Sequence, residues 1–207
     1  MHRAAVRRPY YFPGLAARCA GPPRFGYPAP PMLGKRNIYL VGPMGSGKSA
    51  VGRILARMVD APFKDSDAEI ERRTGVDISY IFEKEGEVRF RQREKEAIEA
   101  LTLLEPLVLA TGGGAILLPE NREMIATRGS VVYLITSVEQ QAHRVSHARH
   151  RPLLANVDPE ATLRQLMLER EPLYASVADF KVTTDGRKIQ AVAEEIIRAL
   201  GFPIAGG

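Results

Sequence analysis

The glycine-rich segment from Gly42 to Ser49 constrains the fold of this chain more than any other feature. It fits the pattern GxxxxGK[ST] and lies between an apolar run at 38–41 and residues 50–59, whose apolar positions have helical spacing. A strand, a tight loop and a helix in this order form an anion site, because loop N–H groups and the helix N-terminus point at one place. A chance match has odds on the order of one in a hundred. We therefore expect a nucleoside triphosphate to bind here.

Individual roles follow from the chemistry of this loop. We expect Lys48 to contact the β- and γ-phosphates and the Ser49 hydroxyl to bind the Mg²⁺ that bridges them. The nucleotide-binding residues expected in the loop are Gly45, Ser46, Gly47, Lys48, Ser49 and Ala50. The loop is shared by GTPases, motor ATPases and small-molecule kinases. The chain has no NKxD guanine-reading motif and, at 207 residues, is short for most motors, which favours a small kinase.

Short apolar runs alternate with helical patterns along the rest of the chain. The runs at 107–110 and 131–135 have Val, Leu and Ile on consecutive positions, which is typical of strands buried on both faces of a parallel sheet. A last strand is expected at 180–183, and helices are expected at 67–73, 77–86, 87–104, 138–149, 159–169 and 189–200. The alternation predicts an α/β protein built as a three-layer sandwich.

The net charge of +5 belongs to the first 36 residues. They contain seven Lys and Arg and no Asp or Glu, so this segment carries +7 and leaves −2 for the remainder. Its Pro, Gly, Arg and Ala content without periodicity predicts a disordered extension, followed by one folded domain at 37–203. We expect a dispensable extension, with Met32 as an alternative start, rather than a targeting peptide. The nearly neutral domain is not expected to bind nucleic acid.

Two further features bear on location. Cys19 is the single cysteine, so an internal disulfide is excluded and a reducing compartment is indicated. No apolar run approaches the roughly 18 residues that a membrane-spanning helix needs. We therefore expect a cytoplasmic protein without a membrane partner.

Two carboxylates, Asp65 and Asp67, lie where a short strand is expected to enter a helix. In an extended segment this spacing aims both side chains the same way. Phosphoryl transfer to an alcohol needs such a pair, one linked to the metal and one to the reacting hydroxyl. The alternative is helix capping, with Ser66 as N-cap and Glu69 as its third-position partner. This segment alone supports both interpretations equally.

Two features downstream also admit a simple and a functional interpretation. Arg91 and Glu94 lie three apart on one helix face, where a solvated ion pair is the simpler interpretation. The segment Thr111-Gly112-Gly113-Gly114 directly follows a buried strand, at the sheet edge where α/β proteins bind ligands. Without side chains, backbone N–H groups can approach a ligand closely. We expect a ligand-binding loop there rather than a flexible connector.

Together these segments resemble shikimate kinase in order and approximate spacing, over about residues 37–201. The matching segments are 42–49, Asp65-Ser66-Asp67, Phe90-Arg91, Thr111-Gly112-Gly113-Gly114, Arg151-Pro152-Leu153-Leu154 and Arg170-Glu171-Pro172-Leu173-Tyr174. The resemblance implies a five-stranded parallel sheet, a fold like that of nucleoside-monophosphate kinases, and a monomer. It also implies that ATP, with Mg²⁺, phosphorylates the 3-hydroxyl of shikimate in aromatic amino-acid biosynthesis.

The resemblance also implies roles for individual residues. Asp67 resembles the carboxylate that holds the reacting hydroxyl and takes its proton, and Asp65 resembles the water-mediated partner of Mg²⁺. Arg91 and Arg170 resemble a clamp on the shikimate carboxylate, for which planar guanidinium groups are suited. The substrate-binding residues implied are Asp67, Phe82, Phe90, Arg91, Glu94, Gly113 and Arg170.

Three more arginines are implied on the nucleotide side. Arg151, in a lid at about 146–158, resembles the catalytic residue that approaches the phosphates on closure, beside Lys48 and Asp67. Arg144 resembles the residue that stacks on adenine. Arg187 is expected as a further nucleotide contact, although the proline that many relatives have near Ile189 is missing here.

Two alternatives remain open on the sequence. A gluconate kinase, or another small-metabolite kinase, has the same scaffold but would need neither the Arg91 and Arg170 pair nor the triple glycine. A non-catalytic nucleotide-dependent binding protein would tolerate the loss of a catalytic position, yet every expected position is intact. The arginine pair with the triple glycine, and the intact catalytic positions, favour the shikimate kinase interpretation over these two alternatives.

Overall fold

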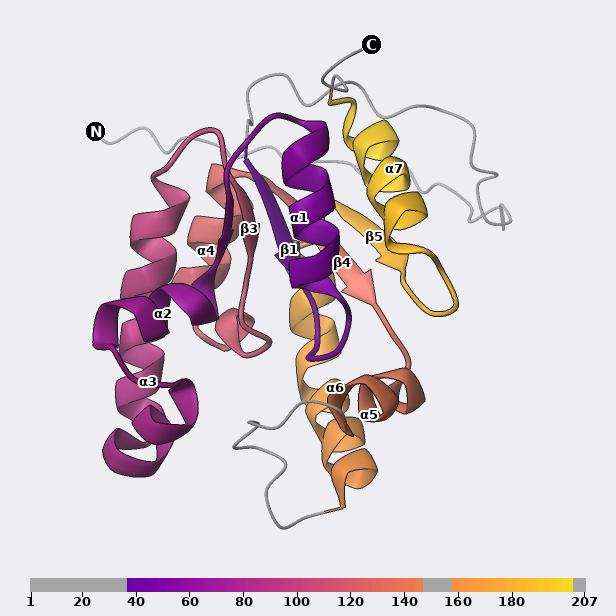
Figure 1. Cartoon of the computed structure of the whole chain (residues 1–207). Helices are drawn as coiled ribbons and strands as arrows, with labels where there is room; N and C mark the ends of the chain where they lie inside the picture. Colours follow the sequence, from indigo (N-terminus) through magenta and orange to yellow (C-terminus); the bar gives the residue numbers. More distant parts are fainter. Residues whose placement is uncertain (1–36, 147–157, 203–207) are drawn as a thin grey trace, which may run out of the picture.

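A five-stranded parallel sheet forms the middle layer of the protein. The computed structural model describes residues 37–146 and 158–202, which form a three-layer α/β sandwich (Figure 1). The strand order is β2-β3-β1-β4-β5, and every pairing is parallel. The strands are β1 (Ile38–Val41), β2 (Phe63–Asp65), β3 (Val108–Ala110), β4 (Ser130–Ile135) and β5 (Phe180–Thr183). The predicted fold class is confirmed.

Helices cover both faces of the sheet. They are α1 (Lys48–Met58), α2 (Ser66–Thr74), α3 (Ile78–Thr102), α4 (Pro119–Arg128), α5 (Val138–Ser146), α6 (Pro159–Val177) and α7 (Ile189–Leu200), with a 3-10 helix, η1 (Ala115–Leu117). Along β1, alternate side chains face opposite ways. Leu40 joins a core with α1 and α7, and Tyr39 joins one with α3, α4 and α6. Among the described residues, no helix is long and apolar enough to span a bilayer.

Most element predictions hold, including the break at Gly86, where φ of 77° and ψ of 172° interrupt α3. Helix α6 extends well past the expected end at 169 and contains Pro172. Pro172 has no N–H to donate to the Leu168 carbonyl. Because Leu168 is exposed, water can donate to this carbonyl instead. Helix α4 and η1 were not expected. The 1–36 extension and most of the 146–158 lid lie outside the described residues.

The strand order brings three functional segments to one edge of the sheet. Leu40 of β1 and Asp65 of β2 both pair with Ala110 of the strand between them. The phosphate loop, the aspartate pair and the glycine segment follow these three strands directly. Parallel strands end at the same edge, so segments distant in sequence meet there.

Candidate active site

The phosphate loop has the backbone that its glycines permit. Gly42, Gly45 and Gly47 have φ of 141°, 76° and 90°, a region that other residues rarely adopt. A side chain at Gly42 would also overlap the Leu134 carbonyl. The Lys48 ammonium donates to the carbonyls of Gly42 at 2.8 Å and Pro43 at 2.7 Å. The cation therefore lies within the curve of the loop, next to the place where phosphates would bind.

Ser49 and Asp65 meet beside this loop. The Ser49 hydroxyl donates to Asp65 Oδ2 at 2.7 Å, and Asp65 Oδ1 accepts from the N–H of Asp67 at 3.1 Å. Asp65 is thus the N-cap of α2, and the expectation of Ser66 as N-cap is wrong. Ser66 Oγ accepts from Gly112 N–H instead. Two hard oxygen ligands at the phosphate end of a nucleotide loop suit Mg²⁺, which usually keeps water and phosphate oxygens as its other ligands.

The capping alternative also assigned a wrong partner to Glu69. Its carboxylate accepts from Arg72 at 2.8 and 2.9 Å and from Arg73 at 2.7 Å, on its own helix. The hydrogen bond from Arg72, with that from Arg73, lowers the pKa of Glu69 to about 2 against the opposing effect of burial. Glu69 therefore stabilises α2 and does not take part in the cap.

A pocket of about 440 Å³ opens between the phosphate loop, α2, α3, the glycine segment and α6. All residues expected to bind the acceptor line it: Asp67, Phe82, Phe90, Arg91, Glu94, Gly113 and Arg170. Ser49 and Asp65 line the same pocket. The structure therefore brings together the residues expected for the acceptor and those expected for the metal.

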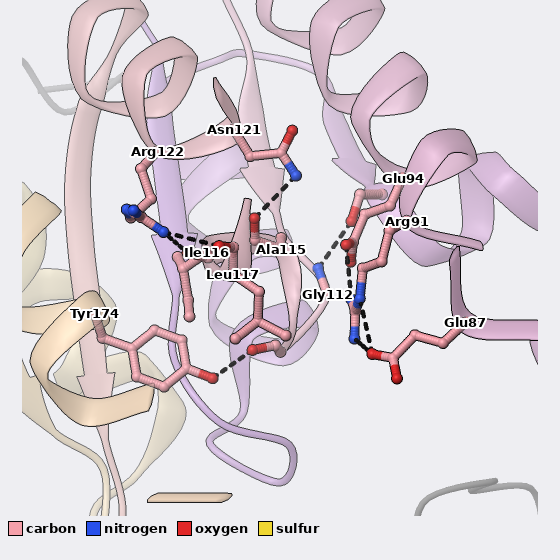
Figure 2. Close-up of polar contacts among 12 residues, drawn as sticks. Glu87, Arg91, Glu94, Gly112, Ala115, Ile116, Leu117, Asn121, Arg122 and Tyr174 are labelled. Atoms are coloured by element: carbon pink, nitrogen blue, oxygen red, sulfur yellow. Dashed lines mark hydrogen bonds and ion pairs between the residues drawn. The ribbon is translucent and has the colours of Figure 1, made fainter. Parts of the chain in front are cut away.

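Arg91 forms the centre of a buried charge cluster in this pocket (Figure 2). It donates to Glu94 Oε2 at 2.7 Å and to Glu87 Oε1 at 2.9 Å. Only 11% of the Arg91 side chain and 1% of the Glu94 side chain are exposed, so the expectation of a solvated pair is wrong. Packing of α3 against the glycine segment excludes water from the pair. Burial raises the pKa of Glu94, and the charges of Arg91 and Arg170 oppose that rise.

Arg170 supplies a second guanidinium group from α6. The residue is 7% exposed, and its Nε has no hydrogen-bond partner among the described residues. Buried donors are nearly always paired in proteins, so an unpaired one that faces a pocket indicates a ligand acceptor. Arg91 and Arg170 together form a site for an anionic group.

An aromatic pair forms the apolar wall of the pocket. The rings of Phe82 and Phe90 have centroids 4.5 Å apart and pack on a small core between α2 and α3. The Arg91 guanidinium lies 5.2 Å from the centre of the Phe90 ring. Such a wall can cover the nonpolar face of a small ring while charged groups hold its edge.

The glycine segment is enclosed by the charged side chains of the pocket. A methyl group at Gly112 would overlap the Asp67 carboxylate, and one at Gly114 would overlap the Arg91 guanidinium. A larger residue at either position would displace Asp67 or Arg91 from the pocket, in keeping with a binding loop rather than a connector.

On the nucleotide side, Arg144 reaches the phosphate loop. Its guanidinium donates to the Gly45 carbonyl at 2.8 Å and to the Thr184 carbonyl at 3.4 Å. Arg187 donates to the Thr183 carbonyl and forms an ion pair with Glu195 at 2.5 Å. Arg151, which the sequence placed in the lid, lies outside the described residues.

Sequence reasoning missed several pocket residues and one buried contact. The missed lining residues are Ala68, Glu71, Asp77, Ile78 and Ser79, whereas Met44, Gly112 and Gly114 belong to the two loops that the sequence predicted. The Tyr174 hydroxyl, which donates to the Gly113 carbonyl at 2.5 Å, was also missed. Its position four residues after Arg170 was a usable signal, since such residues share a helix face.

Comparisons with known proteins agree on one family. Residues 44–201 match the family model described as shikimate kinase. Shikimate kinase of Alteromonas mediterranea is 52% identical over 171 residues, which cover 83% of this chain and 100% of that protein. Shikimate kinase of Pseudomonas entomophila is 53% identical over 165 residues, which cover 80% of this chain and 96% of that protein.

Solved structures give the same result. The shikimate kinase from Acinetobacter baumannii in complex with shikimate has a TM-score of 0.77 and 51% identity, covering 78% of this chain and 90% of that one. The shikimate kinase from Aquifex aeolicus has a TM-score of 0.70 and 37% identity, covering 80% and 96%. A gluconokinase from Sinorhizobium meliloti, with a TM-score of 0.55 and 20% identity, shares the fold alone.

Proposed function

Because the chain belongs to the shikimate kinase family, we propose that ATP lies on its phosphate loop and shikimate in the adjoining pocket. The enzyme phosphorylates shikimate with ATP, forming shikimate 3-phosphate for aromatic amino-acid biosynthesis. The observation that carries the proposed binding mode is the position of Asp67, Arg91 and Arg170 in one pocket beside the phosphate loop.

The two arginines hold the shikimate carboxylate. Arg91 is oriented by Glu94 and Glu87, whereas Arg170 has a buried Nε that lacks an acceptor in the described part of the chain. Each guanidinium is a cation with a planar fork of donors that matches a carboxylate. Phe82 and Phe90 cover one face of the ring. Carboxylate recognition separates shikimate from neutral alcohols.

Asp67 holds the reacting hydroxyl and accepts its proton as the phosphoryl group is transferred. It is the second residue of α2 and lines the pocket together with Met44 of the phosphate loop and with Ser49. A positioned base of this kind contributes about 10² to 10⁴ in rate. The Gly113 N–H is proposed as a backbone donor to the substrate, because no side chain obstructs its approach.

Lys48 stabilises the negative charge of the phosphates. Its ammonium, which now binds the Gly42 and Pro43 carbonyls, needs only a rotation of its flexible chain to reach a phosphate in the loop. Ser49 and Asp65 would hold Mg²⁺, Ser49 directly and Asp65 through water. When bound, the ion supplies charge neutralisation between the β- and γ-phosphates.

The remaining nucleotide contacts are proposals that rest on the family pattern. Arg144 is placed to stack on adenine, and Arg187 to make a further contact after a change of partner from Glu195. Arg151 would approach the phosphates from the lid. A cytoplasmic location and a monomeric state remain predictions from the sequence.

The experiment that tests the role of Asp67 is a comparison of turnover and ATP binding in one variant. Asp67→Asn should lose at least about a hundredfold in kcat with shikimate, while its ATP affinity stays near that of the wild type. Asp60→Asn is the matched control, because Asp60 is exposed in a turn after α1. Near-normal turnover in Asp67→Asn would remove the carboxylate from the mechanism.

A further inference from the structure

The glycine segment needs outside support, because glycine has the widest choice of backbone conformations. Ser66 and Tyr174 bind the glycine segment itself. Asn121 and Arg122, from α4, bind the carbonyls of residues 115–117 directly after it (Figure 2). The Gly112 N–H donates to Ser66 Oγ at 2.8 Å, and Asn121 Nδ2 donates to the Ala115 carbonyl, just past the segment, at 2.9 Å. The Tyr174 hydroxyl binds the residue between them, Gly113.

Tyr174 reaches the segment from the inner side of α6. Its side chain is fully buried, and its ring stacks on Tyr133 with the centroids 5.2 Å apart. The hydroxyl donates to the Gly113 carbonyl at 2.5 Å. Burial raises the pKa of the Tyr174 phenol, so the hydroxyl keeps its proton at physiological pH and can always donate.

The hydrogen bond from Tyr174 to the Gly113 carbonyl also sets the direction of the N–H group in the same peptide. The peptide between Gly113 and Gly114 is trans, so its carbonyl and its N–H point in opposite directions. Tyr174 lies on one side of the segment, and Arg91 lies on the other, against Gly114 (Figure 2). The bond to the carbonyl therefore turns the Gly114 N–H toward the side where Arg91 lines the pocket.

The same tyrosine is tied to the anion site through its helix. Arg170 precedes Tyr174 by four residues, so both side chains lie on one face of α6. Both also line a small hollow of about 10 Å³ together with Pro43 and Met44 of the phosphate loop. A movement of α6 would thus carry the guanidinium and the glycine peptide together.

We propose that Tyr174 is a positioning residue for shikimate. It holds the Gly113–Gly114 peptide in a fixed orientation relative to the Arg170 guanidinium. This role rests on the proposed binding of shikimate in the pocket. Tyr174 does not touch the reacting atoms. It acts through the glycine backbone, to which its hydroxyl donates, and through Arg170, whose charge acts on its phenol.

The test is Tyr174→Phe, which removes only the hydroxyl and leaves the ring stack. We expect kcat/KM for shikimate to fall five- to tenfold, which corresponds to the loss of about one buried hydrogen bond. KM for ATP should stay within twofold of the wild type. Tyr133→Phe is the matched control. The Tyr133 hydroxyl is buried without a partner among the described residues, so its removal should leave both constants unchanged.

A second measurement does not depend on shikimate. Amide hydrogen exchange of the protein with ¹⁵N-labelled glycine should be faster at Gly113 and Gly114 in Tyr174→Phe than in Tyr133→Phe. A wild type without shikimate-dependent turnover would refute the proposed function, while the exchange rates would still show whether Tyr174 holds the glycine peptide. Equal exchange at Gly113 and Gly114 in the two variants would refute that contact.

Four outcomes would overturn the inference. The first is a kcat/KM for shikimate in Tyr174→Phe within twofold of the wild type, even if its Tm falls. The second is an equal loss of kcat/KM in Tyr133→Phe, and the third is a rise of KM for ATP equal to the fall in kcat/KM for shikimate. The fourth is a Tyr174→Phe protein that does not fold, which would make Tyr174 a structural residue.

Discussion

Replacing Arg91 by methionine would remove one half of the buried ion pair in the pocket. Glu94, 1% exposed, would keep its carboxylate but lose the guanidinium that donates to it at 2.7 Å. Breaking a buried pair in this way costs about 3 to 5 kcal/mol, because one charge stays buried without its partner. We expect the lower end, about 3 kcal/mol, since the charge of Arg170 still acts on Glu94.

The loss should depend on pH, with a definite sign. Burial raises the folded-state pKa of Glu94 above its unfolded value, so its contribution to stability is present at low pH and is lost as pH rises through the folded pKa. Without Arg91, which lowers this pKa, the folded value rises further. The comparison is made at one acidic and one mildly alkaline pH, because lower pH favours the neutral, protonated form of the buried Glu94 and higher pH favours the charged form, which burial penalises. The difference from the wild type should therefore grow with pH.

The assay is thermal and guanidinium unfolding of both proteins at the two pH values. For a domain of this size, a loss of about 3 kcal/mol lowers Tm by roughly 6 to 12 °C. Arg93→Met is the matched control, because Arg93 lies two residues along the same helix and forms a half-exposed pair with Glu85. Methionine and arginine have similar helix propensities, so this control should lose less than about 1 kcal/mol at either pH.

Two results would refute this reasoning. If Arg91→Met were destabilised equally at both pH values, the ionisation of Glu94 would not be the source of the loss. If Arg93→Met lost as much stability as Arg91→Met, burial of the pair would not determine its contribution.

Two other predictions concern the anion site and α2. Arg170→Lys should raise KM for shikimate about tenfold with little change in KM for ATP, because an ammonium cannot replace the planar fork of guanidinium; an unchanged KM for shikimate would exclude Arg170 from the clamp. Glu69→Gln should lower the free energy of unfolding by about 1 kcal/mol near pH 7. The folded pKa of Glu69 is lowered to about 2, so this difference should fade as pH drops from 4.5 toward 2; a constant difference in unfolding curves would contradict the assignment.

The sequence predicted the phosphate loop and the sheet because their signals are local. The apolar runs that became β1, β3 and β4 have almost every residue buried, as continuous hydrophobic runs indicate. Helix α4 was missed because Met124 and Ile125 are its only large apolar residues. Pro119 at its start and Glu120 in its first turn were weaker signals that suit a helix N-terminus.

The sequence predicted which residues form the site, but it did not predict their burial or their hydrogen-bond partners. Spacing placed Arg91 and Glu94 on one helix face, but their burial depends on how α3 packs beside the glycine segment. The choice of Asp65 over Ser66 as N-cap depends on a hydrogen bond from Gly112, which is distant in sequence. Tyr174 was missed for the same reason, since its partner lies 61 residues away.

The measurement that tests the central claim most directly is ADP release by the purified protein with ATP and Mg²⁺. Three reactions should be compared: with shikimate, with gluconate and without an acceptor. The account predicts that release depends on shikimate, and that gluconate gives no more than the reaction without an acceptor. ADP release that depends on gluconate, or no release with either acceptor, would contradict the proposed acceptor site. The assignment of the phosphate loop would be unaffected.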